Sequence, residues 1–318
     1  MSRELKYSDI ILLPRYSTLR SRSKASTAVH LGPNIDSFVS PIIPANMRAV
    51  IDEDRAFSLS EDYYFYTMHR FGVDPFEFCK RAQNWKTISI SIGVKPQDKV
   101  YIAALAQRGL RVDYITIDIA HGHSIAMKEM IKFVKKHLPA TFVIGGNVAT
   151  SEAVKALAEW GADCAKVGIG QGYVCTTKDK TGFTRPMFSC VEDCARNKSI
   201  PIIADGGIRC NGDITKALVA GADMVMAGSI FSQCVDSPAV STVVDGRIYK
   251  QYFGSASEHN KKEKKHIEGV MKEVPSNNMT YEEKLTEIQE DLQSAISYAG
   301  GKDLSCFKKV KYLEIQNP

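Results

Sequence analysis

One cysteine of this 318-residue chain lies in a sequence context that indicates chemistry rather than packing. Cys175 belongs to the stretch GIGQGYVCTTKDKTGF, residues 168–183, in which glycine, hydroxyl and basic residues surround it. A free cysteine that serves packing behaves as a small buried hydrophobe and is expected among apolar neighbours. Glycines instead allow a backbone to approach a ligand closely. The pattern predicts a nucleophilic thiol, with Thr177 as its nearest acid–base partner in the sequence.

Lys166 is a competing nucleophile, because it stands at the end of an apolar run. A lysine at the end of a barrel strand can form a Schiff base with a carbonyl substrate. Nothing beside Lys166 marks a carbonyl substrate, so the sequence favours Cys175.

Two further segments carry glycines where an anion could bind, ADGGIRCNGD (204–213) and AGSIF (227–231). Backbone N–H groups of such loops, together with the dipole of a following helix, favour a phosphate. A carboxylate such as Asp205 accepts hydrogen bonds from a ribose diol. The alternative is that Gly206-Gly207 forms merely a tight turn. The agreement of two loops favours a phosphate site, and therefore a nucleotide ligand.

Eight short apolar runs alternate with segments of helical periodicity, and these elements must position the candidate residues. The runs begin at residues 38, 63, 87, 114, 142, 164, 201 and 224, with the widest gap between the sixth and the seventh. Strands that alternate with helices pair in parallel through right-handed crossovers. The sequence therefore predicts an α/β fold, a (β/α)₈ TIM barrel that spans residues 1–318 as a single domain. The segment 279–301 is expected to form a helix that packs on the barrel.

Polar residues and glycines gather where the predicted strands end, which is where barrel enzymes carry their chemistry. These strand ends hold Asn46, His69-Arg70, Asp118 with His121, Gly146-Asn147, residues 168–175, Asp205-Gly206-Gly207 and Gly228-Ser229. Taken together they predict one site at one end of the barrel.

Composition and charge exclude several classes of protein. The N-terminus lacks the apolar stretch of a secretory signal, and no apolar run approaches the roughly 20 residues of a membrane helix. Eight cysteines without a C-x-x-C pair favour reduced thiols and a cytoplasmic protein. The pairs Cys190/Cys194 and His121/His123 lack a second pair at zinc-like spacing. The net charge is +5, and the basic cluster at 260–266 has no interleaved aromatics, so we expect neither nucleic-acid nor membrane partners.

Several motifs in order resemble the IMP dehydrogenase/GMP reductase family, and within it the reductases. They are PIIPANM (41–47), TIDIAHGHS (116–124), FVIGGNV (142–148), KVGIGQGYVCTTK (166–178), PIIADGGIRCNGD (201–213), MVMAGSIF (224–231), YFGSAS (252–257) and SYAGG (297–301). The resemblance implies NADPH-dependent reductive deamination of GMP to IMP and ammonia. Cys175 would attack C2 of the purine to form a covalent thioimidate, while Thr177 and Glu268 would handle the proton given to the departing amine.

The resemblance also implies binding residues. Those implied for GMP are Asp205, Gly206, Gly207, Gly228, Ser229 and Arg70. Those implied for NADPH are Asp118, Ile119, Ala120, Ser21, Arg22, Lys265, Ser297 and Tyr298. The pair Ser21-Arg22 is expected to act on a neighbouring subunit of a homotetramer, and the 279–301 helix is expected to carry Ser297-Tyr298 towards the site. Backbone carbonyls of Gly170 and Gly172 would hold a monovalent cation such as K⁺.

The chain departs from the family pattern at a few positions. Gln171 stands where the family usually has proline, Arg70 where relatives often have lysine, and Lys265 where some relatives have arginine. Two alternatives to a reductase stay open. One is an IMP dehydrogenase catalytic core without the regulatory CBS pair, although the water-activating Arg-Tyr flap motif of that enzyme is absent from HIEGVMKEVP (266–275). The other is a catalytically inactive protein that senses purine nucleotides.

Overall fold

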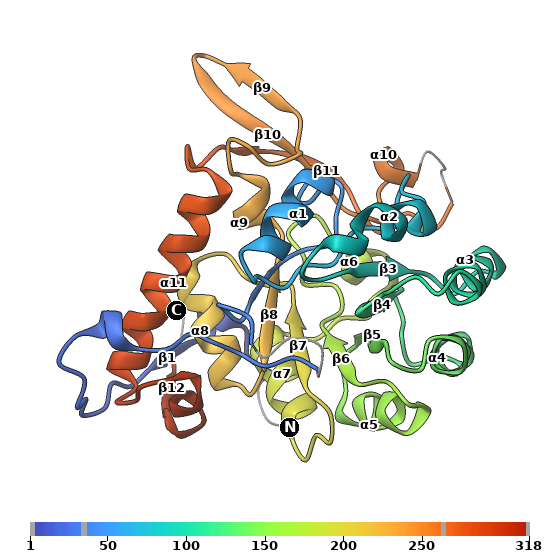
Figure 1. The fold of residues 1–318 in the computed structure, drawn as a ribbon. Helices are drawn as coiled ribbons and strands as arrows, with labels where there is room; N and C mark the ends of the chain where they lie inside the picture. Colours follow the sequence, from blue (N-terminus) through green and yellow to red (C-terminus); the bar gives the residue numbers. More distant parts are fainter. Residues whose placement is uncertain (1–3, 33–36, 262–264, 316–318) are drawn as a thin grey trace.

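A curved sheet of seven parallel strands forms the centre of the molecule in this computed structural model, which describes residues 4–32, 37–261 and 265–315. Along the sheet the order is β2-β8-β7-β6-β5-β4-β3. The strands are β2 (Ile42–Pro44), β3 (Ser89–Ile92), β4 (Tyr114–Asp118), β5 (Phe142–Val148), β6 (Cys164–Val167), β7 (Ile202–Asp205) and β8 (Met224–Ala227). Figure 1 shows helices on the outside of this sheet, as expected when each crossover between parallel strands packs back onto it.

One of the eight predicted strands, at residues 63–70, lies in the gap between β3 and β2. It closes this gap without forming a regular strand. Met68 bridges Ile90 of β3 in parallel, and its backbone N–H donates to the Ser89 carbonyl at 3.0 Å. On the other side, the backbone N–H of Val39 donates to the Tyr63 carbonyl at 2.9 Å. The predicted (β/α)₈ barrel is therefore confirmed, with one of its eight strand positions reduced to an isolated β-bridge.

Helices cover the barrel from outside. They are α1 (Glu53–Glu61), α2 (Pro75–Arg81), α3 (Pro96–Gln107), α4 (Ile125–His137), α5 (Ser151–Trp160), α7 (Met187–Ala195), α8 (Asn211–Val219) and α11 (Tyr281–Tyr298). Several begin at a residue whose side chain accepts a hydrogen bond from the first turn. Ser124 caps α4 and Thr150 caps α5 in this way, and Thr280 and Glu283 form a reciprocal capping box on α11.

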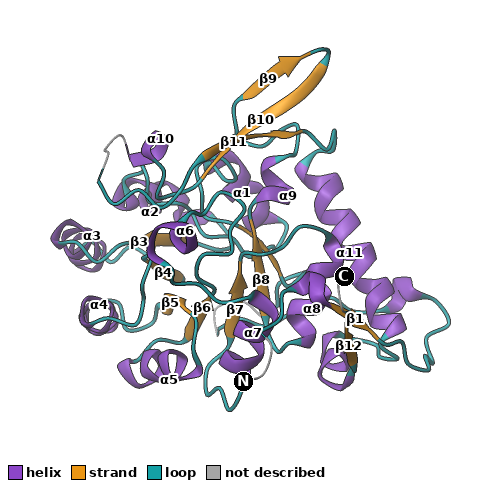
Figure 2. Cartoon of the chain, turned by 180° about the vertical axis from the view of Figure 1, so that it is seen from behind, coloured by secondary structure: helices purple, strands orange, loops and turns teal. Residues whose placement is uncertain are grey.

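Two insertions lie at the carboxyl ends of the strands. The first follows β6 and contains the short helix α6 (Thr177–Thr181), which explains the widest gap between predicted strands. The second follows β8 and begins with α9 (Ser229–Ser232). It continues through the antiparallel strands β9 (Ser241–Val244), β10 (Arg247–Phe253) and β11 (Met271–Pro275), with α10 (Glu258–Lys261) between the last two. Figures 1 and 2 show β9 and β10 extending away from the barrel.

The two ends of the described chain meet at the opposite side of the barrel. Strand β1 (Ile10–Leu12) pairs antiparallel with β12 (Tyr312–Glu314), and both lie beside the end of α11 in Figure 1. Four short 3₁₀ helices complete the fold: η1 (Tyr7–Asp9), η2 (Arg22–Lys24), η3 (Ala82–Asn84) and η4 (Leu304–Lys309). Among the described helices, none combines the length and the apolar character that crossing a membrane requires.

Candidate active site

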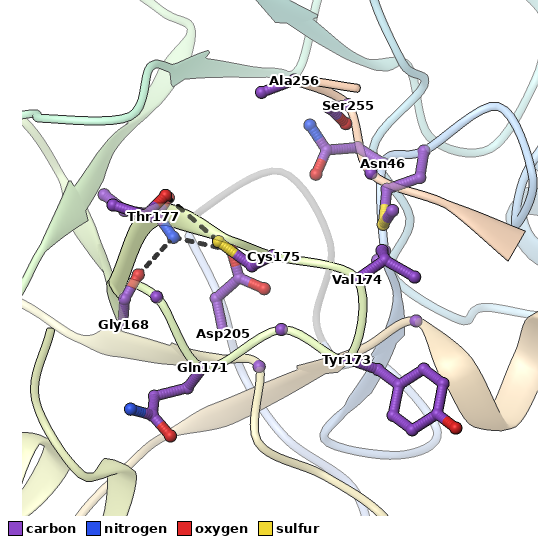
Figure 3. Close-up of a pocket in the computed structure, with 18 of the residues that line it drawn as sticks. Asn46, Gly168, Gln171, Tyr173, Val174, Cys175, Thr177, Asp205, Ser255 and Ala256 are labelled. Atoms are coloured by element: carbon purple, nitrogen blue, oxygen red, sulfur yellow. Dashed lines mark hydrogen bonds between the residues drawn. The ribbon is translucent and has the colours of Figure 1, made fainter. Parts of the chain in front are cut away.

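The carboxyl ends of the strands surround a cavity of about 400 Å³. Its lining comes from the loops after β2, β4, β5, β6, β7 and β8, together with the segment between β10 and β11. Figure 3 shows Cys175, Thr177 and Asp205 facing the same space. Most of the strand-end residues named from the sequence therefore lie around one cavity.

Cys175, Thr177 and Glu268 form a hydrogen-bonded relay. The Cys175 thiol donates to Thr177 Oγ1 at 3.2 Å, and Thr177 Oγ1 donates to Glu268 Oε2 at 2.6 Å. Figure 3 marks the first of these bonds. A nucleophile bonded to a group that is itself bonded to a carboxylate is the arrangement expected for activation by proton removal. The geometry thus joins the three residues that the sequence analysis assigned to catalysis.

Glu268 reaches the cysteine loop across 91 residues of sequence because backbone pairing holds the two segments together. The Thr176 N–H donates to the Glu268 carbonyl at 2.9 Å, and the Val270 N–H donates to the Val174 carbonyl at 3.0 Å. Between these bonds, Cys175 forms an antiparallel bridge with Gly269. The insertion after β8 therefore delivers the carboxylate, and the loop after β6 delivers the thiol.

Close backbone approach fixes the start of the cysteine loop. Gly168 has a φ of +133°, and a Cβ at this position would stand 2.2 Å from the Asp205 carbonyl oxygen. Gln171, which departs from the usual proline, anchors the loop through its side chain: Nε2 donates to Thr184 Oγ1 at 2.7 Å. Thr184 in turn donates to the Ile169 carbonyl at 2.9 Å. A side-chain contact thus restrains the loop where a proline ring would restrict the backbone.

A buried ammonium links two carboxylates at the floor of the cavity. Lys166 Nζ lies 3.2 Å from Asp118 Oδ1 and 2.5 Å from Asp205 Oδ2, and its side chain is 3% exposed. Burial favours the neutral amine, but the two carboxylates outweigh it and raise the pKa of Lys166 above the ordinary lysine value. A Schiff base requires a neutral amine, so this environment argues against the Schiff-base alternative.

Two asparagines complete this floor. Asn46 Nδ2 donates to Asp118 Oδ2 at 2.9 Å, and Asn147 Nδ2 donates to Asp205 Oδ2 at 2.8 Å. Burial alone would raise the pKa of Asp118, but Lys166 and the Asn46 bond hold it below its usual range. Asp118 is therefore held charged, and both side chains offer oxygen acceptors to hydroxyl or amide groups of a ligand.

The two glycine loops line the cavity beside this floor, with Gly206, Gly207, Gly228 and Ser229 all in its wall. Gly206 and Gly207 have φ values of +96° and +80°, which a residue with a side chain rarely adopts. A Cβ on Gly228 would stand 2.2 Å from the Tyr252 hydroxyl oxygen. The positive φ values of Gly206 and Gly207 and the close approach of Tyr252 to Gly228 therefore require glycine at these positions.

The residues implied for the cofactor divide into two groups. Asp118, Ile119 and Ala120 line the cavity, as does Arg70. The remaining ones are not among its described lining residues: Ser21, Arg22, Lys265, Ser297 and Tyr298.

The end of α11 lies at the far side of the barrel, against the N-terminal segment. The Arg15 N–H donates to the Tyr298 carbonyl at 2.8 Å, and Arg22 Nη1 donates to Ser294 Oγ at 3.1 Å. The expectation that this helix carries Ser297 and Tyr298 towards the cavity of its own chain is wrong, because α11 starts at the carboxyl ends of the strands and runs away from them. A cofactor contact from these residues would need a neighbouring subunit.

Arg70 lies near Asp118 in the cavity wall. Its guanidinium packs 4.6 Å from the Phe71 ring centre and contributes to the lowered pKa of Asp118. Its Nε is buried without a hydrogen-bond partner among the described residues. The assignment of Arg70 to GMP stays a prediction. These contacts are equally compatible with a role in binding the nicotinamide cofactor.

The cation prediction rests on backbone carbonyls. Gly170 and Gly172 both line the cavity, and Gly170 has a φ of +78°. The Gly172 carbonyl accepts a hydrogen bond from the Cys175 N–H at 3.1 Å, which leaves its second lone pair for another ligand. Within the described ranges, no cluster of three or more histidine, cysteine or acidic side chains is arranged to hold a metal ion.

The sequence analysis missed several residues of the site. Arg209, Tyr252 and Lys261 line the cavity, and although Arg209 and Tyr252 lie inside quoted motifs, no role was assigned to any of the three. Burial raises the pKa of Tyr252, which keeps its hydroxyl protonated as a donor. His121, in contrast, is exposed and is not among the described lining residues.

Known proteins match this chain along nearly its full length. The family model described as the IMP dehydrogenase / GMP reductase domain matches residues 76–317. The GMP reductase of Leptothrix cholodnii is 48% identical over 312 residues, covering 96% of this chain and 94% of that protein. Those of Enterococcus faecalis and Bacillus subtilis are 49% and 47% identical, with 98% and 100% of this chain and 96% and 98% of their own lengths covered. This chain therefore belongs to the IMP dehydrogenase / GMP reductase family.

Proposed function

We propose that this chain is a GMP reductase, which converts GMP to IMP and ammonia with NADPH as the reductant. The observation that carries the proposal is the Cys175–Thr177–Glu268 relay at the wall of the cavity that also holds the two glycine loops. The glycine loops and Asp205 suit the phosphate and ribose of a nucleotide, and the relay suits attack on its base. The GMP reductase relatives support the same substrate.

In the first half-reaction, Cys175 adds to C2 of the purine and the amino group leaves. Thr177 passes the thiol proton to Glu268, since its Oγ1 lies within hydrogen-bond distance of both the Cys175 thiol and Glu268 Oε2. Glu268 then returns that proton through Thr177 to the departing amine, which leaves as ammonia. A bond from sulfur to C2 replaces the bond from nitrogen to C2, and the product is a covalent thioimidate. The covalent intermediate divides one difficult substitution into two easier steps.

The residues present fit a nicotinamide cofactor beside the nucleotide. The Asn147 Oδ1 and Arg70 Nε atoms are buried without hydrogen-bond partners among the described residues, and both side chains line the cavity. They offer one acceptor and one donor to a second ligand, next to Asp118, Ile119 and Ala120. Bound NADPH supplies the hydride for C2 of the intermediate.

In the second half-reaction, C2 gains the hydride, the bond from C2 to sulfur breaks, and Cys175 leaves as a thiolate. The thiolate takes up one proton, so that GMP, NADPH and one proton yield IMP, NADP⁺ and ammonia. Glu268, once it has taken a proton from solvent, can pass that proton through Thr177 to restore the thiol. The relay therefore acts in both directions during one turnover.

The two rival functions remain alternatives with distinct predictions. An IMP dehydrogenase core would oxidise IMP and then hydrolyse the intermediate, which needs a residue that activates water. A nucleotide sensor would bind GMP without turnover. The intact relay favours a working enzyme over the sensor.

We further propose that the carbonyls of Gly170 and Gly172 bind K⁺. We also propose a homotetramer, in which Ser21, Arg22, Ser297 and Tyr298 contact the cofactor of a neighbouring subunit. Finally, we propose a single catalytic domain over residues 1–318 and a cytoplasmic location. Two carbonyl oxygens do not fill the coordination shell of K⁺, so other segments would have to complete it. Comparing rates in K⁺ and Na⁺ buffers, and measuring the mass of the protein in solution, tests the first two.

The experiment that tests the function is the change in absorbance at the reduced-nicotinamide band, with GMP and NADPH in one sample and IMP and NAD in another. We expect GMP-dependent loss of NADPH together with IMP and ammonia. Production of NADH in the second sample alone would indicate a dehydrogenase core. GMP binding without either reaction would indicate the sensor. Cys175→Ala should abolish turnover and leave GMP binding intact.

A further inference from the structure

Tyr173 is flanked by two cationic side chains at the rim of the cavity. The guanidinium carbon of Arg209 lies 5.0 Å from the centre of the Tyr173 ring, and Lys272 Nζ lies 4.7 Å from it. Such distances permit cation–π attraction. We name these three residues the Tyr173 cluster. It connects the loop that carries Cys175, the glycine loop after β7, and strand β11.

The two cations of the Tyr173 cluster form no direct ion pair among the described residues, although the Asp213 carboxylate is near enough to favour the charged form of Arg209. In residues 4–32, 37–261 and 265–315, no ion pair joins Arg209 or Lys272 to an acidic side chain. The Arg209 guanidinium instead donates from Nη2 to the Gln171 carbonyl at 3.1 Å and from Nη1 to the Ile208 carbonyl at 3.3 Å. Two positive charges near one ring repel each other, and together they attract an anion.

The other cations that line the cavity have different neighbours. Lys166 is neutralised by the two carboxylates of the floor. Arg70 packs on Phe71 on the side of Asp118, and Lys261 donates to the His266 carbonyl at 2.8 Å. Arg209, in contrast, belongs to the glycine loop after β7.

The position of Arg209 places its charge next to the proposed phosphate site. It stands two residues after Gly207 in the same loop, and a Cβ on Gly206 would stand 3.4 Å from the Gly172 backbone nitrogen. The turn at Gln171, which Arg209 contacts, therefore lies against the same glycines. Backbone N–H groups bind a phosphate through partial charges, and they leave its net charge without a counterion.

We propose that Arg209 selects a nucleoside monophosphate over the unphosphorylated nucleoside, with Tyr173 holding the guanidinium in place and Lys272 adding a second positive charge. This inference rests on the proposed function, because it concerns the phosphate of GMP. A guanidinium offers charge-assisted, two-pronged hydrogen bonds to phosphate oxygens. The aromatic ring restricts the guanidinium before the ligand arrives, which reduces the entropy lost on binding.

The test compares the dissociation constants of GMP and guanosine, measured by calorimetry on the full chain. In Arg209→Gln, the dissociation constant for GMP should rise about 10- to 100-fold, because a hydrogen bond to a charged group is lost, while that for guanosine stays unchanged. Arg209→Lys should retain part of the preference for GMP over guanosine, since lysine keeps the positive charge but cannot form bidentate hydrogen bonds. The matched control is Arg247→Gln, which removes the same charge from an exposed site on β10 and should alter neither constant.

A pH series separates charge recognition from a structural effect. The second ionisation of a phosphomonoester lies near pH ~6, so the wild-type affinity for GMP should fall as the pH drops through this value. Arg209→Gln should flatten that dependence, which a general loosening of the loop would not do. If Arg209→Gln fails to fold, the same two dissociation constants are measured for Arg209→Lys and Tyr173→Leu. In both variants the affinity for GMP should fall and the affinity for guanosine should stay unchanged.

An unchanged ratio of GMP to guanosine affinity in Arg209→Gln would overturn the inference, as would an equal effect of Arg247→Gln. Failure of the proposed function is recognised separately, because it appears as an absence of GMP-dependent NADPH oxidation by the wild-type protein. The binding ratio remains measurable in that case and still decides the role of Arg209.

Discussion

Replacing Thr177 by valine tests the proton relay with the least disturbance of shape. Valine has nearly the volume of threonine, but it can neither accept from the Cys175 thiol nor donate to Glu268. In the structure Thr177 Oγ1 spans the gap between them with bonds of 3.2 Å and 2.6 Å, so its loss breaks the relay at the centre. General acid–base catalysis contributes about 10²–10⁴-fold, so kcat should fall by about this factor. This corresponds to about 3–5 kcal/mol in the activation free energy.

The assay is GMP-dependent NADPH oxidation, with GMP affinity and thermal unfolding measured on the same preparations. We expect GMP affinity and the unfolding temperature to stay near the wild-type values, because Thr177 is not in the buried core. Thr177→Ser keeps the hydroxyl and should retain most of the activity. Turnover by Thr177→Val close to the wild-type rate would refute the relay, and so would an equal loss in Thr177→Ser.

Three further perturbations probe the floor of the cavity and the cysteine loop. Lys166→Met should lower the free energy of unfolding by about 3–5 kcal/mol in urea titrations, because it leaves buried carboxylates without their cation. Gly168→Ala should abolish NADPH oxidation or prevent folding, since the added Cβ would stand 2.2 Å from the Asp205 carbonyl oxygen; circular dichroism distinguishes the two, and a fully active variant would contradict the geometry. The folded-state pKa of Asp118 lies below its ordinary value of 3.8, so its contribution to stability is present above that pH and is lost as the pH falls through the folded pKa. Asp118→Asn should therefore make the acid unfolding curve less steep there, and an unchanged curve would contradict this assignment.

The barrel was predictable from the sequence because its strands correspond to short apolar runs between segments of helical periodicity. The run at residues 63–70 illustrates the limit of this argument. Its central residues, 65–69, are buried like those of the other strands, yet backbone pairing reduces it to a single bridge at Met68. Apolar character predicts burial at the barrel wall, but the length of a regular strand depends on neighbours that the local sequence does not contain.

The site was predictable where its residues lie inside motifs at strand ends, as for Cys175 and Asp205. Glu268 was assigned through the family resemblance, since no local pattern connects it with a thiol 93 positions away. Arg209 and Tyr252 lie inside quoted motifs but were given no role, because their contacts come from segments far apart in the sequence. For the end of α11, the motif match assigned a role to Ser297 and Tyr298 but did not indicate in which subunit they act. The expectation that they reach the cavity of their own chain therefore failed.

The most direct test of the central claim is a reaction of GMP with NADPH that carries deuterium in its transferable position. The account predicts IMP with deuterium at C2 and an equal amount of ammonia from the wild-type protein, and neither product from Cys175→Ala. IMP without deuterium, or labelled IMP formed equally well by Cys175→Ala, would contradict reduction through a covalent intermediate on this thiol.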